Sequence, residues 1–157
     1  MQSLSDRNGC ERLFGQKSQA MSFDIYVQSY QNGASCGIPR QRVREVFGPH
    51  LSEVQPNHWK LRYDHANSCD IDLKSDEADG TKVSDFSVHR PCGDERLWDA
   101  LASVLTIGNL VLYFPGGRPL VGRSSVIEHL PSDLIEALGQ PLVVTSGGEI
   151  QRELQMT

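Results

Sequence analysis

The fold is decided by two short segments, NHWKLRY at residues 57–63 and CDIDLK at residues 69–74. In both, apolar and polar side chains alternate with the period of two that a strand with one buried face requires. Residues 64–68 separate them and are long enough to form a hairpin loop. The two segments therefore predict an antiparallel hairpin with one apolar face and one charged face.

With residues 64–68 as the loop, a single register matches both faces of this hairpin. Its apolar face pairs Tyr63 with Cys69, Leu61 with Ile71 and Trp59 with Leu73. Its charged face pairs basic side chains with acids, Arg62 with Asp70 and Lys60 with Asp72. We expect these exposed pairs to contribute little to stability, about 0.2–1 kcal/mol each.

Further segments extend the sheet and supply helices. Strands are predicted at 23–28, 83–90, 110–114, 119–121 and 141–145, and helices at 40–47, 94–107, 124–130 and 132–138. The helix at 94–107 has the longest apolar stripe, with Leu101 at its middle. The continuous apolar run 110–114 indicates a central strand covered on both sides. This order predicts an α+β fold, a largely antiparallel sheet with helices packed on one face in two layers.

The two ends of the chain differ from its middle. Residues 1–20 are polar with no apolar period, and an alternating strand pattern begins just after Met21. We therefore expect a disordered leader over 1–20 that folding does not require, with Met21 as a possible start of translation. The polar residues 147–157 suggest a frayed tail, which leaves 21–146 as one α+β domain.

Composition narrows the class of protein. The 157 residues include 20 acids and 15 bases, a formal net charge of −5 that disfavours general nucleic-acid binding. The cysteines lie more than twenty residues apart, unlike a zinc site or a disulfide framework, at Cys10, Cys36, Cys69 and Cys92. No apolar run is long enough to span a bilayer. We expect a small cytoplasmic protein of bacterial type with reduced thiols and no membrane or nucleic-acid partner.

Two motif-like strings do not carry their usual chemistry. GRPLVGRS at 117–124 has the spacing of a phosphate-binding P-loop, but Arg123 replaces the lysine and Pro119 removes one loop amide. The acidic stretch around Gly80 resembles a calcium loop, but Phe86 stands where the bidentate glutamate is required. The sequence therefore predicts no cofactor and no metal.

Histidines and cysteines offer only weak catalytic candidates. His58, Asp85 and His89 fall on the outer face of the predicted sheet, where they could form a metal or acid–base cluster. Cys36 lies in a flexible loop before a helix, but no histidine is placed near it. We assign no catalytic residue from the sequence.

The leading functional hypothesis is a non-enzymatic module that binds another protein, such as an inhibitor or an immunity-like protein. Its acidic and polar sheet face would meet a basic partner, through Lys60, Arg62, Asp70, Asp72, Asp76, Glu77, Asp79 and Asp85. The alternative is an enzyme or small-molecule binder with a site built from loops, near Cys36, Gly116-Gly117 and Ser146-Gly147-Gly148.

Overall fold

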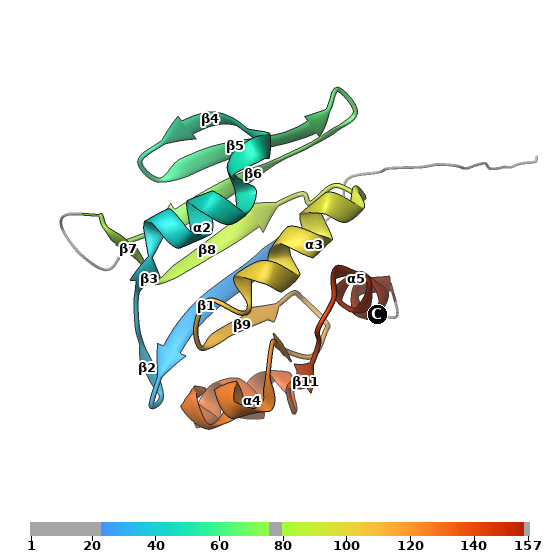
Figure 1. Ribbon diagram of the computed structural model, residues 1–157. Coiled ribbons are helices and arrows are strands. Elements are labelled where there is room, and N and C mark those ends of the chain that lie inside the picture. The colour runs from blue at the N-terminus through green and yellow to red at the C-terminus, as the bar shows by residue number, and fades with distance from the viewer. Residues whose placement is uncertain (1–22, 76–79, 156–157) are drawn as a thin grey trace, which may run out of the picture.

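The computed structural model describes residues 23–75 and 80–155 and shows a large twisted sheet with helices on it (Figure 1). The sheet has nine strands in the order β11-β10-β9-β1-β8-β6-β5-β4, with β2 paired to β1. Its strands are β1 Ile25–Gln31, β2 Ala34–Ser35, β4 Leu51–Gln55, β5 His58–Asp64, β6 Asn67–Lys74, β8 Asp85–His89, β9 Leu110–Tyr113, β10 Leu120–Val121 and β11 Leu142–Val143. A small second sheet pairs β3 Ile38–Pro39 with β7 Lys82–Val83.

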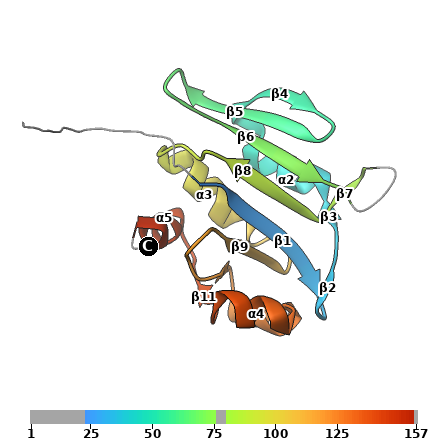
Figure 2. The same ribbon diagram turned by 180° about the vertical axis from the view of Figure 1, so that it is seen from behind.

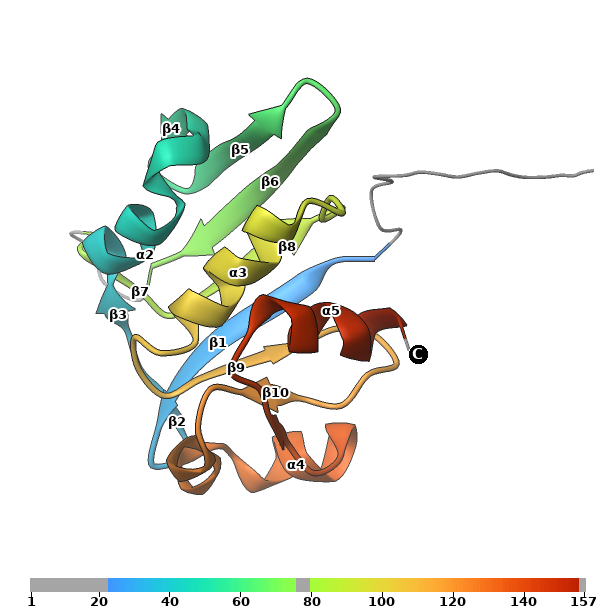
Figure 3. The ribbon, with the colours of Figure 1, turned by 45° about the vertical axis from the view of Figure 1, so that its right-hand side comes forward.

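The helices are α2 Arg40–Phe47, η1 Gly48–His50, α3 Glu95–Val104, η2 Ser124–His129, α4 Ser132–Leu138 and α5 Gly147–Gln155. Helices α2, α3 and α5 cover one face of the sheet, which we call the inner face (Figure 3). Trp59 and Trp98 lie in the core between them and are at most 1% exposed. All pairings in the large sheet are antiparallel except β10 with β11. The predicted α+β sandwich is confirmed.

The opposite, outer face is covered at one end only. Val111 on β9 and Val121 on β10 point to this face and form a second apolar cluster with Val126 and Leu130. Helices η2 and α4 therefore lie over β9 and β10, while β8, β6 and β5 are not crossed by a described helix (Figure 2). The prediction that helices pack on one face omitted this second layer. It was correct that the run 110–114 is covered on both sides.

The prediction for the hairpin of β5 and β6 is correct for the two faces but wrong for the register. Lys60 lies opposite Asp70 and not Asp72, Arg62 lies opposite Ser68, and His58 lies opposite Asp72. The Asp64 carboxylate accepts hydrogen bonds from the Ala66 amide at 2.8 Å and from the Asn67 side chain at 3.0 Å. This local turn makes the loop tighter than predicted. Because the slip is two residues, every side chain keeps its face.

Strand β4 was not predicted, because its apolar residues do not alternate. Leu51 and Val54 are three residues apart, and the pairing of β4 with β5 shifts register between Leu51 and Glu53. A bulge of this kind adds a residue to one strand and breaks the period of two. Val54 pairs with Trp59 and therefore faces the inner side of the sheet.

The C-terminal region is also different from the prediction. Residues 147–155 form α5, which packs on α3 and buries Gly147, Ile150 and Leu154. The prediction of a frayed tail is therefore wrong for these residues. The Ser146 hydroxyl accepts a hydrogen bond from the Glu149 amide at 3.2 Å, and Glu149 accepts one from the Thr145 amide at 2.6 Å. These bonds satisfy amides at the start of the helix.

The predicted leader at 1–20 and the residue Met21 lie outside the described residues. Within the described part of the chain, no helix has both the length and the apolar character needed to cross a membrane. The same part contains three free cysteines, of which Cys69 and Cys92 are buried in the core.

Candidate functional site

A network of histidines and aspartates lies on the uncovered half of the outer face. Three adjacent strands supply it: His58 comes from β5, Asp70 and Asp72 from β6, and His89 from β8. The register places His58 opposite Asp72 and His89 opposite Asp70. Asp24, just before β1, adds a third carboxylate. These side chains share one face because they alternate with the core residues of their strands.

Asp72 is the centre of this network and joins the two imidazoles. Its Oδ1 lies 2.6 Å from Nδ1 of His58, and its Oδ2 lies 2.5 Å from Nε2 of His89. The other nitrogens are also engaged: Nε2 of His58 lies 3.3 Å from Asp70, and Nδ1 of His89 lies 3.0 Å from Asp24. Every imidazole nitrogen of the network therefore faces a carboxylate.

The contacts shift the pKa values of the network in opposite directions. The hydrogen bond to Asp72 is the main cause that raises the pKa of His58. Burial lowers the pKa of His89, but its hydrogen bonds to Asp24 and Asp72 outweigh this and the net shift is upward. The pKa of Asp72 is lowered, first by the hydrogen bond to His58. All these groups are at least 33% exposed, so water screens their interactions.

This arrangement predicts a pH-dependent contribution to stability. Because the pKa values of both histidines are raised in the folded protein, their contribution to stability is complete below the pKa of an unfolded histidine, about 6.5. This contribution is lost as the pH rises through the pKa values of the folded state. The lowered pKa of Asp72 means that its share is present above about 3.9 and is lost as pH falls through the folded value. We therefore expect melting temperature to fall more between about pH 6 and pH 8 than in the variant His58→Gln/His89→Gln, by roughly 1–4 °C.

Melting curves of both proteins at the same ionic strength measure this difference. A variant whose melting temperature responds to pH as the natural protein does would show that the histidine contacts contribute nothing to folding.

The sequence placed a candidate metal or acid–base cluster at this part of the outer face. No described group of three or more histidine, cysteine, aspartate or glutamate side chains could hold a metal ion. The proposed cluster of His58, Asp85 and His89 is correct for the two histidines but wrong for Asp85. Asp85 lies opposite Lys74 and Gln28, and burial raises its pKa. The carboxylate between the histidines is Asp72.

The remaining predicted residues are only partly brought together. Lys60 and Arg62 lie on the same outer face, and neither makes an ion pair with an acid within the described residues. Asp76, Glu77 and Asp79 lie outside the described residues. The structure therefore groups Lys60, Arg62, Asp70 and Asp72 on the face of β5 and β6.

Two of the three loops of the alternative site, at Cys36 and at Gly116-Gly117, do not meet. Cys36 donates its amide to the Ser29 carbonyl near the end of β1, whereas Gly116-Gly117 follow Tyr113, which pairs with Tyr26 near its start. These two segments thus lie at opposite ends of β1. Ser146 precedes α5, and Gly147 is buried against α3.

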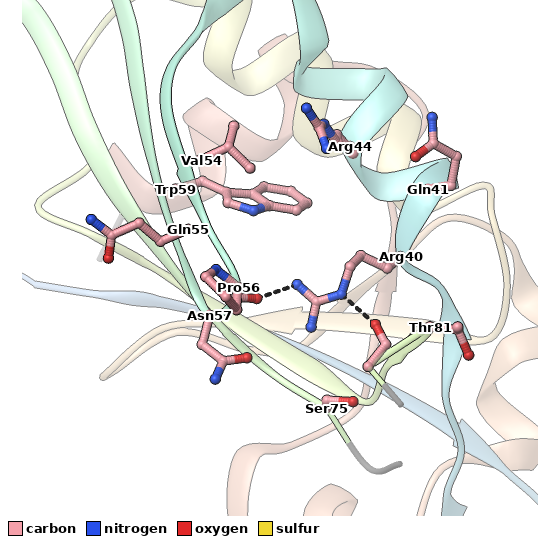
Figure 4. Close-up of a pocket in the computed structure, with 11 residues that line it drawn as sticks. Arg40, Gln41, Arg44, Val54, Gln55, Pro56, Asn57, Trp59, Ser75 and Thr81 are labelled. Atoms are coloured by element: carbon pink, nitrogen blue, oxygen red, sulfur yellow. Dashed lines mark hydrogen bonds between the residues drawn. The ribbon is translucent and has the colours of Figure 1, made fainter. Parts of the chain in front are cut away.

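A groove on the inner face, between α2 and the hairpin of β4 and β5, was not predicted from the sequence (Figure 4). Its volume is about 720 Å³, within the usual range of ligand sites. Trp59 and Val54 line one side, and Arg40 and Arg44 project from α2 on the other. The other lining residues are Gln41, Gln55, Pro56, Asn57, Ser75, Gly80 and Thr81.

No family model, no curated protein and no solved structure matches this chain. Its function has to be inferred from the chemistry of two surfaces. One is the histidine–aspartate network of the outer face, and the other is the groove beside α2.

Proposed function

We propose that this protein is a non-catalytic, cytoplasmic protein-binding module, of the inhibitor or immunity-like kind, whose partner docks on the open half of the outer face. The observation that carries the proposal is the ordered array of charges on β8, β6 and β5, where no described helix covers the sheet. The opposite end of the same face is buried under η2 and α4.

The array is held in place before any partner arrives. Asp72 is fixed between two histidines, so a partner's basic group meets carboxylates whose positions are already restricted. Such preorganisation reduces the entropy lost on binding. Lys60 and Arg62 add positive charge beside the acids, so the face presents both signs. Patterns of this type speed encounter and reject partners with the wrong charge arrangement.

An exposed aromatic residue borders the array. Tyr26 on β1 lies opposite Ser87 of β8, is 36% exposed, and stacks on Tyr113 with ring centroids 5.4 Å apart. Tyrosine is enriched in protein interfaces because it buries a large area with few rotatable bonds. It gives a partner an apolar contact next to the charged groups.

The test reverses charge on the array. Asp70→Lys/Asp72→Lys should keep the fold, because the two side chains are 42% and 51% exposed, but should lose the partners of the natural protein. The matched control is Asp133→Lys/Glu136→Lys on α4, which makes the same change in net charge on exposed residues away from the array. Affinity capture from lysate of the source organism, with quantitative mass spectrometry, compares all three proteins beside their melting curves.

The comparison has clear outcomes. Partners retained by the α4 control and lost by the β6 variant support docking on the outer face. An identical set of partners for the natural protein and the folded β6 variant would remove this face as the binding surface.

A further inference from the structure

We propose that the groove between α2 and the hairpin of β4 and β5 binds an extended acidic peptide segment of a partner protein. This site is distinct from the outer-face array, because it lies on the inner side of the sheet, where Val54 faces the same way as Trp59. It requires neither the histidine–aspartate network nor its partner.

Charge is the first reason for an acidic ligand. Arg40 and Arg44 are the only charged side chains among the described lining residues, in a chain whose formal net charge is −5. The Arg44 side chain makes no hydrogen bond or ion pair within the described part of the chain, and the residue is exposed. The first turn of α2 contains no acid, so the positive end of the helix dipole adds to the charge of Arg40, the first residue of the helix.

Arg40 is already oriented by the backbone. Its Nε donates to the Gly80 carbonyl at 2.6 Å and its Nη1 donates to the Pro56 carbonyl at 2.5 Å (Figure 4). A guanidinium has five N–H donors, so the rest stay available for a carboxylate. A cation held in this way loses little freedom when a ligand binds, and bonds between charged partners are the stronger class.

Shape and backbone favour a peptide over a small anion. Val54 faces the inner side, lines the groove and is 44% exposed. It can receive an apolar side chain beside the carboxylates. Strand β4 is the last strand of the sheet, so one of its edges has no strand partner in the described structure. An extended peptide can pair with such an edge, and a small anion cannot.

The test begins with selection from a phage-displayed library of random peptides on the natural protein. Enriched sequences should carry acidic residues next to an apolar residue. One enriched peptide is then synthesised with a fluorophore, and its affinity is measured by fluorescence polarisation. We expect Arg44→Glu to weaken binding at least about tenfold, since hydrogen bonds between charged partners are the stronger class and the new carboxylate would repel the acidic peptide.

The chain offers a matched control on the same helix. Arg42→Glu makes the same charge change on an exposed residue of α2 that does not line the groove, and it should leave affinity within about threefold. Asp70→Lys/Asp72→Lys should also bind the peptide, which separates this proposal from the outer-face proposal.

Several results would overturn the peptide site. They are enrichment of peptides without acids, no enrichment, or equal loss of affinity with Arg42→Glu and Arg44→Glu. Displacement of the peptide by free phosphate or citrate at matched concentration would instead indicate a small-anion site. Melting curves of each variant confirm that the compared proteins are folded.

Discussion

Replacing Leu101 by alanine is expected to lower the free energy of unfolding by about 2–5 kcal/mol. Leu101 is fully buried at the middle of α3, the helix that lies between α2 and α5 on the sheet. Truncation removes apolar contacts and leaves a cavity that packed neighbours on the helix and strand sides cannot fill. A loss of this size is a large part of the stability of a small domain.

Urea denaturation followed by circular dichroism measures this loss, with Ser103→Ala as the control. Ser103 is on the same helix but exposed, so its variant should stay within about 0.5 kcal/mol of the natural protein. Coincident denaturation midpoints for Leu101→Ala and the natural protein would show that α3 does not bury this face.

Replacing Gly147 by alanine is expected to cost about 1–3 kcal/mol, the usual effect of overpacking. A Cβ at this position would lie 2.5 Å from the backbone nitrogen of Asp99 and 2.5 Å from the carbonyl carbon of Trp98. Backbone atoms of α3 cannot move aside as a flexible side chain can, so α5 would have to shift outward. That shift would expose Ile150 and Leu154, which are buried where α5 packs.

Gly148→Ala is the matched control for this prediction. A Cβ there meets only the Ser146 hydroxyl at 3.8 Å, and alanine favours a helix by up to about 1 kcal/mol over glycine. Equal stability of the two alanine variants in urea denaturation would show that α5 is not seated against α3 at Gly147.

The sequence was sufficient for the faces of the strands but not for their alignment. Alternation in β5, β6 and β8 placed Trp59, Ile71 and Val88 in the core, as observed. The register depended on the loop, where the Asp64 side chain closes a tight turn that alternation does not reveal. For that reason Lys60 was paired with the wrong aspartate.

Two elements were missed for different physical reasons. The bulge in β4 places Leu51 and Val54 three residues apart, so the strand does not show a period of two. Helix α5 did carry a signal: Ser146 and Glu149 have the spacing of a capping box, and Ile150 and Leu154 are four residues apart. Polar composition outweighed that signal in the prediction.

The candidate sites show the same difference between features that alternation predicts and features that depend on register or tertiary packing. His58 and His89 were placed on the outer face because face depends only on alternation. Asp72 was not recognised as their common partner, because the predicted register differed by two residues from the observed one and placed Asp72 opposite Lys60. The groove depends on how α2 sits over the β4–β5 hairpin, a tertiary relation that no local pattern encodes.

The central place of β1 affects how the chain is made. The first described strand in the sequence pairs with β8 and β9, so only the short β2 is available to it until residues 85–113 have been synthesised. During translation, Ile25 and Val27 leave the ribosome long before Val88 and Phe86, with which they pair in β8, have been synthesised. Assembly of the sheet therefore requires closing long stretches of chain, which makes folding slow compared with that of helical bundles.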